Sequence, residues 1–158
     1  MCVSSHSPGP VEDDETLVSV VTSPNYVSHQ GHVEPTLFES RISNGVSTDR
    51  KAHTTLQEFD LRAEALVADN EKKTNCGSIE LIVGKIRSIS HEGSRAIAVY
   101  DTALQKNRSH AEIVCTEIPA SGTPGRKKLR ATLRKKVLDA CMHDGKVVAS
   151  SELFKNIR

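Results

Sequence analysis

The sequence predicts an α+β domain: a small, largely antiparallel sheet with one packed central helix and a basic C-terminal helix. Three observations favour this fold class. Runs rich in β-branched residues are joined by hairpin-length links, one stretch has the apolar spacing of a packed helix, and a second such stretch is crowded with Lys and Arg. A doubly wound sheet would need more helices between its strands. With 158 residues the chain is long enough for one compact domain, and two full domains are not expected.

Composition divides the chain into four segments. Residues 1–15 combine Ser, Pro, Gly and acidic side chains with almost nothing to bury, so we expect a disordered lead. Residues 16–118 form the expected α+β core, and 119–125 is a linker with two prolines and two glycines. Residues 126–158 then form a basic helical segment that packs on the core.

The first part of the core is expected to hold a strand, a short helix and a loop. "LVSVV" (17–21) is β-rich and is closed by the turn-forming "SPNY". One or two helical turns would begin near Pro35, because proline is tolerated at a first helical position. "SNGVSTDRKAH" (43–53) indicates a loop, since its Asn-Gly pair is surrounded by Ser, Thr and Asp.

A helix over residues 56–69 is the clearest element of the first half. Thr55 and Glu58 have the spacing of a capping box, and Gly77 follows as a stop. The apolar positions recur at helical spacing, at Leu56, Phe59, Ala63, Leu66 and Val67.

The second half of the core predicts three strands. "SIELIVGKIRSI" (78–89) and "RAIAVYD" (95–101) are β-branched runs separated by "SHEGS", which favours a hairpin. "AEIVCTEI" (111–118) is the third strand. The expected core residues of this sheet are Ile79, Leu81, Val83, Ile86, Ile97, Val99, Ile113 and Cys115.

The C-terminal segment predicts a basic amphipathic helix that ends at Gly145. Its apolar residues lie four apart on one face, at Leu129, Leu133, Val137 and Cys141. "SSELFKNI" would add a last turn or two, with Ser150 or Ser151 as the cap.

Charge is distributed unevenly. The net charge is +1, yet residues 119–158 carry ten Lys and Arg against three Asp and Glu, while residues 1–118 carry eleven against seventeen. Five cations of the basic helix spread over its non-apolar faces: Arg126, Lys127, Arg130, Arg134 and Lys135. We expect this surface to bind nucleic-acid phosphates with salt-sensitive affinity and little sequence reading. A solvated helix that balances the acidic body, or a module for an acidic protein partner, is the alternative.

His110-Ala111-Glu112 has the form of the first half of the zinc deaminase signature. That chemistry also needs a Pro-Cys-x-x-Cys segment to supply two thiolates, and the chain has none. "AEIVCTEI" also favours a strand, whereas the deaminase pair opens a helix. His29 and His32 flank Gly31 in a turn-like stretch. We therefore expect neither a metal nor a cofactor.

The alternative function is a small enzyme that acts on a nucleotide-like or phosphorylated substrate. Arg50 and His53 lie in a stretch whose donors suit a phosphate or a carboxylate. His53 and His110 would be the bases and Glu112 a carboxylate of the same site, which Tyr100 and Asp101 would join. Arg50 could equally form a structural ion pair with an aspartate, with Asp49 or Asp101 as its partner.

"SPNYVSHQGHVEPTLFESR", "GVSTDR" and "AVYDTALQKNRSHAEI" occur in the order found in a family of small uncharacterised bacterial proteins. The chain resembles that family, in which a Ser-Val-x-Arg segment precedes an Asn-Pro-Ala-His-Ala segment. It departs from the pattern at Arg108, where the family has proline, and at Ser109, where it has alanine. The resemblance implies a single domain and a shared site for Arg50 and His110. It implies no activity.

The sequence predicts a soluble cytoplasmic protein with reduced thiols. No apolar run is long enough to span a membrane, and the start lacks a basic segment followed by an apolar one. The cysteines are widely spaced and form no Cys-x-x-Cys pair: they are Cys2, Cys76, Cys115 and Cys141.

Overall fold

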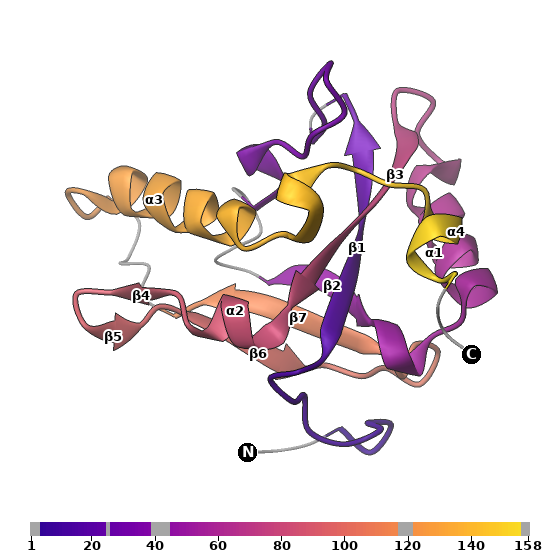
Figure 1. Ribbon diagram of the computed structural model, residues 1–158, viewed down its shortest axis with the longest axis horizontal. Coiled ribbons are helices and arrows are strands. Elements are labelled where there is room, and N and C mark those ends of the chain that lie inside the picture. Colours follow the sequence, from indigo (N-terminus) through magenta and orange to yellow (C-terminus); the bar gives the residue numbers. More distant parts are fainter. Residues whose placement is uncertain (1–3, 25, 39–44, 117–121, 156–158) are drawn as a thin grey trace.

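The computed structural model describes residues 4–24, 26–38, 45–116 and 122–155 and has the predicted α+β architecture (Figure 1). Five strands form one sheet in the order β3-β1-β2-β7-β6, and each pairing in it is antiparallel. The strands are β1 (Thr16–Ser23), β2 (Val46–Arg50), β3 (Thr74–Ile82), β6 (Ile97–Asp101) and β7 (His110–Cys115). A separate two-stranded ribbon consists of β4 (Ser90–His91) and β5 (Ser94–Arg95).

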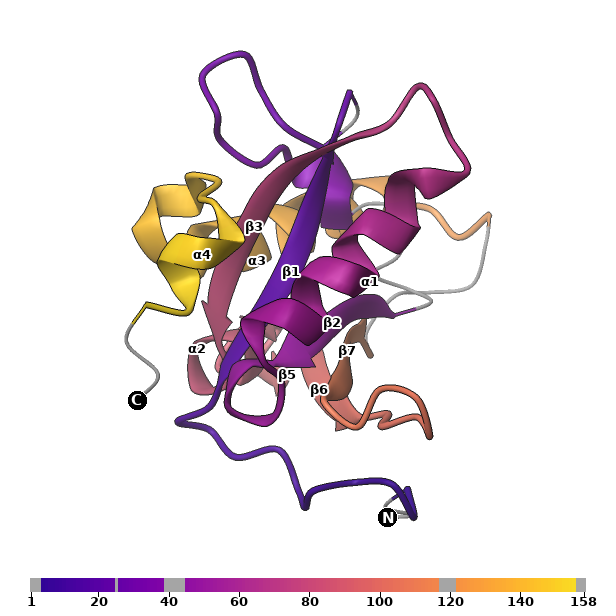
Figure 2. The ribbon, with the colours of Figure 1, turned by 90° about the vertical axis from the view of Figure 1, so that its right-hand side faces the viewer.

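Helices cover the two faces of the sheet unequally. In Figure 2, α1 (Leu56–Ala68) passes in front of β1 and β2, and α3 (Arg126–Asp139) lies behind the sheet. The main core cluster combines strand residues with buried residues of α3, of α2 (Val83–Arg87) and of the 3-10 turn η1 (Pro35–Phe38). The opposite face has a smaller cluster, in which α1 and α4 (Ser150–Leu153) pack against β1.

β1 is covered on both faces, which explains its nearly continuous apolar run. Leu17 belongs to the main cluster and Val18 to the smaller one, and both side chains are fully buried. Successive side chains of a strand point to opposite faces, so a strand between two packed layers needs apolar residues at consecutive positions.

The prediction of a loop over 43–53 is wrong for its described part. Val46–Arg50 is β2, the middle strand of the sheet, and the 3-10 turn η2 (Lys51–His53) follows it. Residues 43 and 44 lie outside the described residues. Strand propensity depends strongly on context, and β2 is paired with β1 on one side and β7 on the other. These two ladders override the local preference of Ser, Thr and Asp.

The predicted hairpin between 78–89 and 95–101 is also wrong in its pairing. β3 pairs with β1 along its length, and the chain then enters α2 at Val83. The turn over 90–94 does form, but it joins only the short strands β4 and β5. β6 continues to the far edge of the sheet, where it pairs with β7. The expected core residues are nevertheless buried.

The helix predicted over 56–69 is confirmed as α1. Thr55 Oγ1 accepts a hydrogen bond from the Glu58 N–H at 3.2 Å, and Glu58 Oε2 accepts one from the Thr55 N–H at 2.9 Å. This reciprocal capping box satisfies two backbone donors that the helix itself leaves unpaired.

Residues 4–15 are not the disordered lead that composition suggested. Val11 is buried in the main core cluster, and the Val83 N–H donates to Glu15 O at 3.0 Å. Ser4 Oγ donates to Ala103 O at 2.8 Å. Long-range backbone contacts of this kind compensate the ordering entropy that local composition cannot offset. Residues 1–3 lie outside the described part.

α3 has the predicted apolar stripe. Leu133 and Val137 are buried in the main core cluster, and Leu129 packs against it half-buried. Cys141 is buried there too, but it has an extended backbone beyond the end of α3, so the expectation that it belongs to the helix is wrong. The helix ends at Asp139, before the predicted stop at Gly145, because a 3-10 turn η3 (Met142–Gly145) follows. The predicted last turn forms as α4, but it begins at Ser150, so its cap is Ala149, which offers no side-chain acceptor, and not Ser150 or Ser151. The predicted linker is described only from residue 122 onward.

Candidate functional site

Strand pairing separates the two residues that sequence reasoning placed in one site. Asp49 lies opposite His110, and Ser47 lies opposite Glu112. Directly paired residues point to the same face of a sheet, and successive residues alternate. Ser47, Asp49, His110 and Glu112 therefore share the face that carries α1. Arg50 follows Asp49 and points to the other face, so Arg50 and His110 do not form one site.

The remaining members of the expected enzyme site divide in the same way. Tyr100 lies opposite Glu112 on the α1 face, whereas Asp101 lies opposite Ala111 on the core face. His53 belongs to η2, is exposed, and lines a separate hollow with Glu58. The predicted set is thus distributed over three places.

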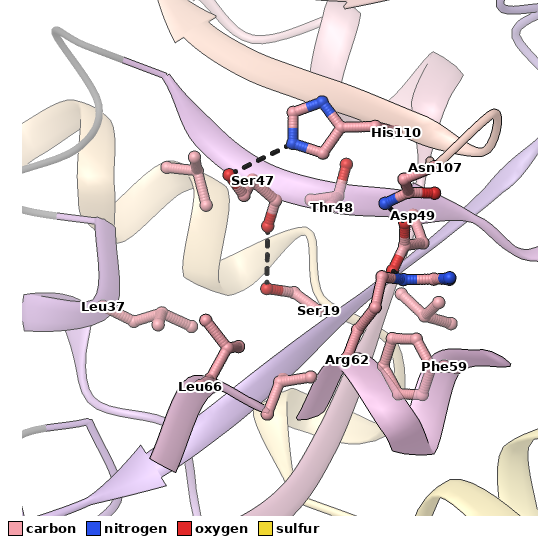
Figure 3. A pocket seen from close by; sticks show the side chains of 13 residues that line it. Ser19, Leu37, Ser47, Thr48, Asp49, Phe59, Arg62, Leu66, Asn107 and His110 are labelled. Atoms are coloured by element: carbon pink, nitrogen blue, oxygen red, sulfur yellow. Dashed lines mark hydrogen bonds and ion pairs between the residues drawn. The ribbon is translucent and has the colours of Figure 1, made fainter. Parts of the chain in front are cut away.

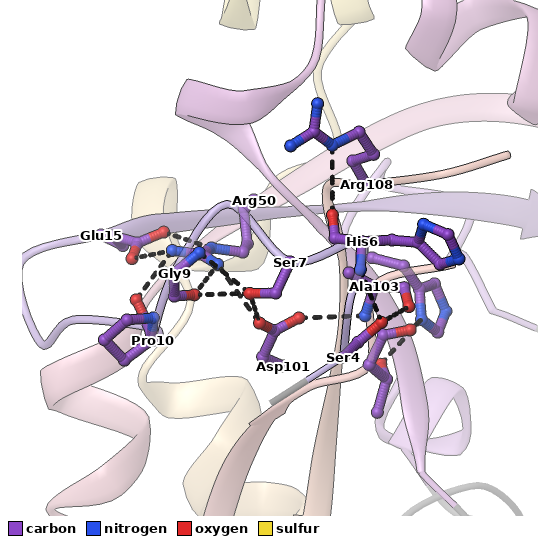
Figure 4. A network of polar contacts seen from close by, with 12 residues as sticks. Ser4, His6, Ser7, Gly9, Pro10, Glu15, Arg50, Asp101, Ala103 and Arg108 are labelled. Atoms are coloured by element: carbon purple, nitrogen blue, oxygen red, sulfur yellow. Dashed lines mark hydrogen bonds and ion pairs between the residues drawn. The ribbon is translucent and has the colours of Figure 1, made fainter. Parts of the chain in front are cut away.

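Arg50 is a structural residue. It is 2% exposed and lies in a polar network with residues of the N-terminal segment (Figure 4). Its Nε and Nη2 donate to the two carboxylate oxygens of Glu15 at 2.7 and 2.6 Å, and its Nη1 and Nη2 donate to the carbonyls of Gly9 and Pro10. Asp101 Oδ2 lies 3.9 Å from Nη1. The structural alternative for Arg50 is the one observed, but its main partner is Glu15 instead of the expected aspartate, and Asp101 is a second, more distant partner. The guanidinium is thus occupied by the protein itself.

The pairing with Arg50 changes the pKa of Glu15. Its partial burial works toward a higher pKa, but hydrogen bonds from the Arg50 guanidinium and the Glu12 N–H, with the positive charge of Arg50, outweigh burial. The pKa of Glu15 therefore lies below its usual value.

His110 lies at the start of β7 with both ring nitrogens close to polar atoms. Figure 3 shows its contact with Ser47. Nε2 is 3.3 Å from the Ser47 hydroxyl oxygen. Nδ1 is 2.7 Å from Thr102 Oγ1 and 3.2 Å from Thr102 O. Ser47 itself is exposed, and Glu112 crowds Gly45, whose added Cβ would lie 2.9 Å from the Glu112 carboxyl group.

Ser47 and His110 line a pocket of about 320 Å³ between α1 and the sheet. In Figure 3, Ser47, His110 and Asn107 lie in the upper half of the view, and Leu37 and Leu66 lie in the lower half. The apolar lining residues of the pocket are Val18, Val20, Leu37, Val46, Phe59 and Leu66. Its polar lining residues are Ser19, Ser47, Thr48, Asp49, Arg62, Asn107 and His110. The pocket therefore has an apolar body and a polar end.

Asp49 organises the polar end. Its Oδ1 accepts hydrogen bonds from Asn107 Nδ2 at 2.8 Å and Ser109 Oγ at 2.9 Å, and its Oδ2 accepts one from Arg62 Nε at 3.2 Å. Arg62 Nη2 also donates to Thr54 Oγ1 at 2.6 Å. The carboxylate is 7% exposed and held by donors from α1 and from the loop before β7.

Sequence reasoning missed Asp49, Arg62, Asn107 and Thr102 as members of this site. The available signal was the alternation within "VSTDR". Once 46–50 is recognised as a strand, Ser47 and Asp49 must lie on one face.

The two histidine patterns weighed as metal ligands lack further donors. His110 and Glu112 lie on a strand, unlike the helix-opening pair of deaminases. His29 and His32 are exposed in a bend, where Ser28 Oγ accepts from the N–H of His32. Among the described residues, no group of three or more His, Cys, Asp or Glu is arranged to hold a metal ion.

The cations of α3 differ in exposure. Lys127 and Lys135 are exposed, as is Lys128. Arg126, Arg130 and Arg134 are half-buried, and both Arg130 and Arg134 interact with other parts of the protein. The lysines, rather than the arginines, therefore form most of the accessible charge.

Comparison of the chain with protein-family models, curated proteins and solved structures finds no match. Across the described ranges, no helix combines the length and the apolar character needed to cross a membrane.

Proposed function

We propose that the protein binds a polyanion, with nucleic acid the best candidate, through the solvent-facing side of α3. The observation that carries this proposal is that α3 has seven Lys and Arg among 14 residues, against one acidic residue, while its apolar stripe is already used by the core. The exposed Lys127, Lys128 and Lys135 are therefore not needed to attach the helix. A dense row of cations is the footprint that phosphate backbones bind.

The N-terminal end of α3 supports the proposal because its charges oppose helix stability. Arg126, Lys127 and Lys128 occupy the first turn, which has no acidic residue, and Gly125 makes no side-chain cap. The amide groups of a helix N-terminus already carry a partial positive charge, so anions stabilise this end and cations destabilise it. A bound phosphate would relieve this repulsion.

The exposed cations extend beyond the helix. Lys128 and Lys135 are two turns apart, about 10.5 Å along the helix axis. Lys136 Nζ donates to Ser90 O at 2.7 Å, so the β4–β5 ribbon, with the exposed Arg95, lies beside α3. A helix and a ribbon thus contribute to one basic surface.

Recognition by phosphate contacts, without base stacking, fits the placement of the aromatic residues. α3 has no aromatic residue, and Phe38 and Phe59 are buried in the two core clusters. Tyr100 is 44% exposed, but it lies on β6, on the face of the sheet that carries α1. Binding to single strands through stacking platforms would require exposed aromatic rings. We therefore propose binding with little sequence preference and a strong dependence on salt.

Fluorescence anisotropy with labelled DNA and RNA duplexes across a salt series tests this function. Lys128→Glu/Lys135→Glu is the variant, because both lysines are exposed, whereas Arg130 and Arg134 make contacts within the fold. Losing two phosphate contacts should lower the slope of log affinity against log salt by about 1.8.

Lys72→Glu/Lys106→Glu is the matched control, since it changes the net charge equally at exposed lysines outside α3. Equal loss in both variants would show a general charge effect and contradict an α3 interface. Tight binding to polyglutamate with no binding to either duplex would replace nucleic acid with an acidic protein partner. No binding to any of these polymers at low salt would overturn the proposal.

A further inference from the structure

The Ser47–His110 pair has the arrangement of a nucleophile and its base. The Ser47 hydroxyl oxygen lies 3.3 Å from His110 Nε2, and the ring is held from its other side by Thr102. Serine is a weak nucleophile on its own and is activated by a neighbouring base that a third group orients. Ser47 is the nucleophile, His110 is the base and Thr102 is the orienting group.

The contacts of Nδ1 favour a proton on that nitrogen of His110. A backbone carbonyl can only accept, and Thr102 O lies 3.2 Å from Nδ1. Both contacts of Nδ1 with Thr102 are hydrogen bonds when Nδ1 donates, since Oγ1 can also accept. Nε2 then has a free lone pair directed at the Ser47 hydroxyl group, which is the tautomer that a general base needs.

Asp49 adds a fixed negative charge beside this ring. It lies directly opposite His110 in the β2–β7 ladder, where paired Cβ atoms are about 4.5–5.5 Å apart. Its side-chain oxygens accept hydrogen bonds from Arg62, Asn107 and Ser109, which fix its position. A carboxylate in this place stabilises the imidazolium that forms when His110 takes a proton.

The pocket next to the pair indicates the class of substrate. Its volume of about 320 Å³ is at the small end of ligand pockets, and its walls beyond the polar end are apolar. Arg62 and Asn107 line the same pocket, and no hydrogen bond joins Arg62 Nη1 to the described residues. An oxygen acceptor attached to a short apolar chain matches this lining.

We propose that this pocket is an acyl-transfer site that hydrolyses small carboxylic esters with short acyl chains. Ser47 Oγ attacks the ester carbonyl carbon while His110 Nε2 takes the hydroxyl proton. The bond to the alcohol oxygen breaks, and His110 returns the proton to the departing alcohol. Water then attacks the acyl-Ser47 ester with His110 again as the base, which releases the carboxylic acid and restores the serine hydroxyl group.

A fluorophosphonate probe tests the nucleophile directly, because it forms a stable bond only with an activated serine. We expect mass spectrometry of the labelled wild-type protein to find the probe on Ser47. Ser47→Ala should abolish the label, and Ser94→Ala, at an exposed serine of β5, should keep it. Label on another serine, or none, overturns the proposal. The site of the label is read on the wild-type protein, so the test holds even if Ser47→Ala unfolds.

Hydrolysis of p-nitrophenyl butyrate tests the base. His110→Ala should lower the rate by about 10²–10⁴-fold at neutral pH, with circular dichroism confirming the fold. The wild-type rate should fall toward acid pH, because a protonated imidazole cannot take the serine proton. A folded His110→Ala protein that keeps both the wild-type rate and its pH profile would show that His110 is not the base and overturn the mechanism.

Discussion

Glu15 and Arg50 form a two-point ion pair that ties the N-terminal segment to the central strand of the sheet. Glu15 Oε2 is 2.7 Å from Arg50 Nε, and Oε1 is 2.6 Å from Nη2. Arg50 is almost fully buried, so its charge depends on this partner and on the Gly9 and Pro10 carbonyls. Removing one partner of such a pair leaves a buried charge without compensation.

The first prediction concerns this pair. We expect Glu15→Gln to lower the free energy of unfolding by about 1–3 kcal/mol at neutral pH, because the Arg50 guanidinium loses its charged acceptor. The pKa of Glu15 in the folded protein lies below its usual value of 4.5. Its contribution is therefore present above about 4.5 and is lost as the pH falls through the folded value.

Urea unfolding of both proteins at several pH values measures this effect. The difference between wild type and Glu15→Gln should shrink toward zero in acid. Glu12→Gln is the control, since its side chain is exposed and it serves Glu15 only through its backbone N–H. A constant difference at all pH values would assign the effect to packing instead of charge.

The second prediction tests the start of α1. Thr55→Ala removes the acceptor for the Glu58 N–H and should cost about 0.5–2 kcal/mol of stability. Thr55→Ser keeps the hydroxyl group and should stay close to wild type. Chemical denaturation of the two variants compares them at a site where only the cap changes. Equal destabilisation by both would mean that the methyl group, not the cap, is responsible.

Elements governed by neighbouring residues could be predicted from the sequence. α1 could be predicted because its cap and its apolar spacing lie within one segment. The apolar stripe of α3 could be predicted for the same reason. The strand β2 could not be predicted. Ser47 and Asp49 favour turns locally, and their strand conformation depends on ladders with β1 and β7 that are formed by distant residues.

The candidate site was only partly predictable for the same physical reason. His110 was identified as a candidate residue, but its neighbours are set by register. One step along β2 separates Asp49, which faces His110, from Arg50, which faces the core. Periodicity cannot supply the register between strands that are about 60 residues apart. Arg62 enters the site only because α1 packs over β2.

The third prediction concerns thiol reactivity. Burial, with a smaller contribution from the Asp139 charge, raises the pKa of the Cys141 thiol to about 12. Cys115 is also buried, whereas Cys76 is exposed. In a Cys2→Ser protein, a thiol reagent near neutral pH should therefore modify Cys76 first, since the thiolate is the reactive form. Rapid modification of Cys141 in the folded state would contradict its burial.

The fourth prediction tests the docking of α3. Leu133 is fully buried between α3 and the main core, so Leu133→Ala should cost about 2–5 kcal/mol. Leu61→Ala is the matched control, because this α1 residue is 61% exposed and should change stability little. Thermal and urea unfolding give the comparison. If Leu133→Ala lowered the free energy of unfolding as little as Leu61→Ala does, α3 would not be part of the cooperative unit.

The fifth prediction follows from the separation of the two proposed activities by the sheet. α3 covers the main core face, and the Ser47–His110 pocket lies on the face that carries α1. Changes at sites without shared contacts usually act independently. Lys128→Glu/Lys135→Glu should therefore weaken nucleic-acid binding and leave butyrate ester hydrolysis unchanged, while Ser47→Ala should do the reverse. Both activities should be measured on both variants. Loss of both activities in either folded variant would show that the two faces are coupled and that one surface, not two, serves the protein.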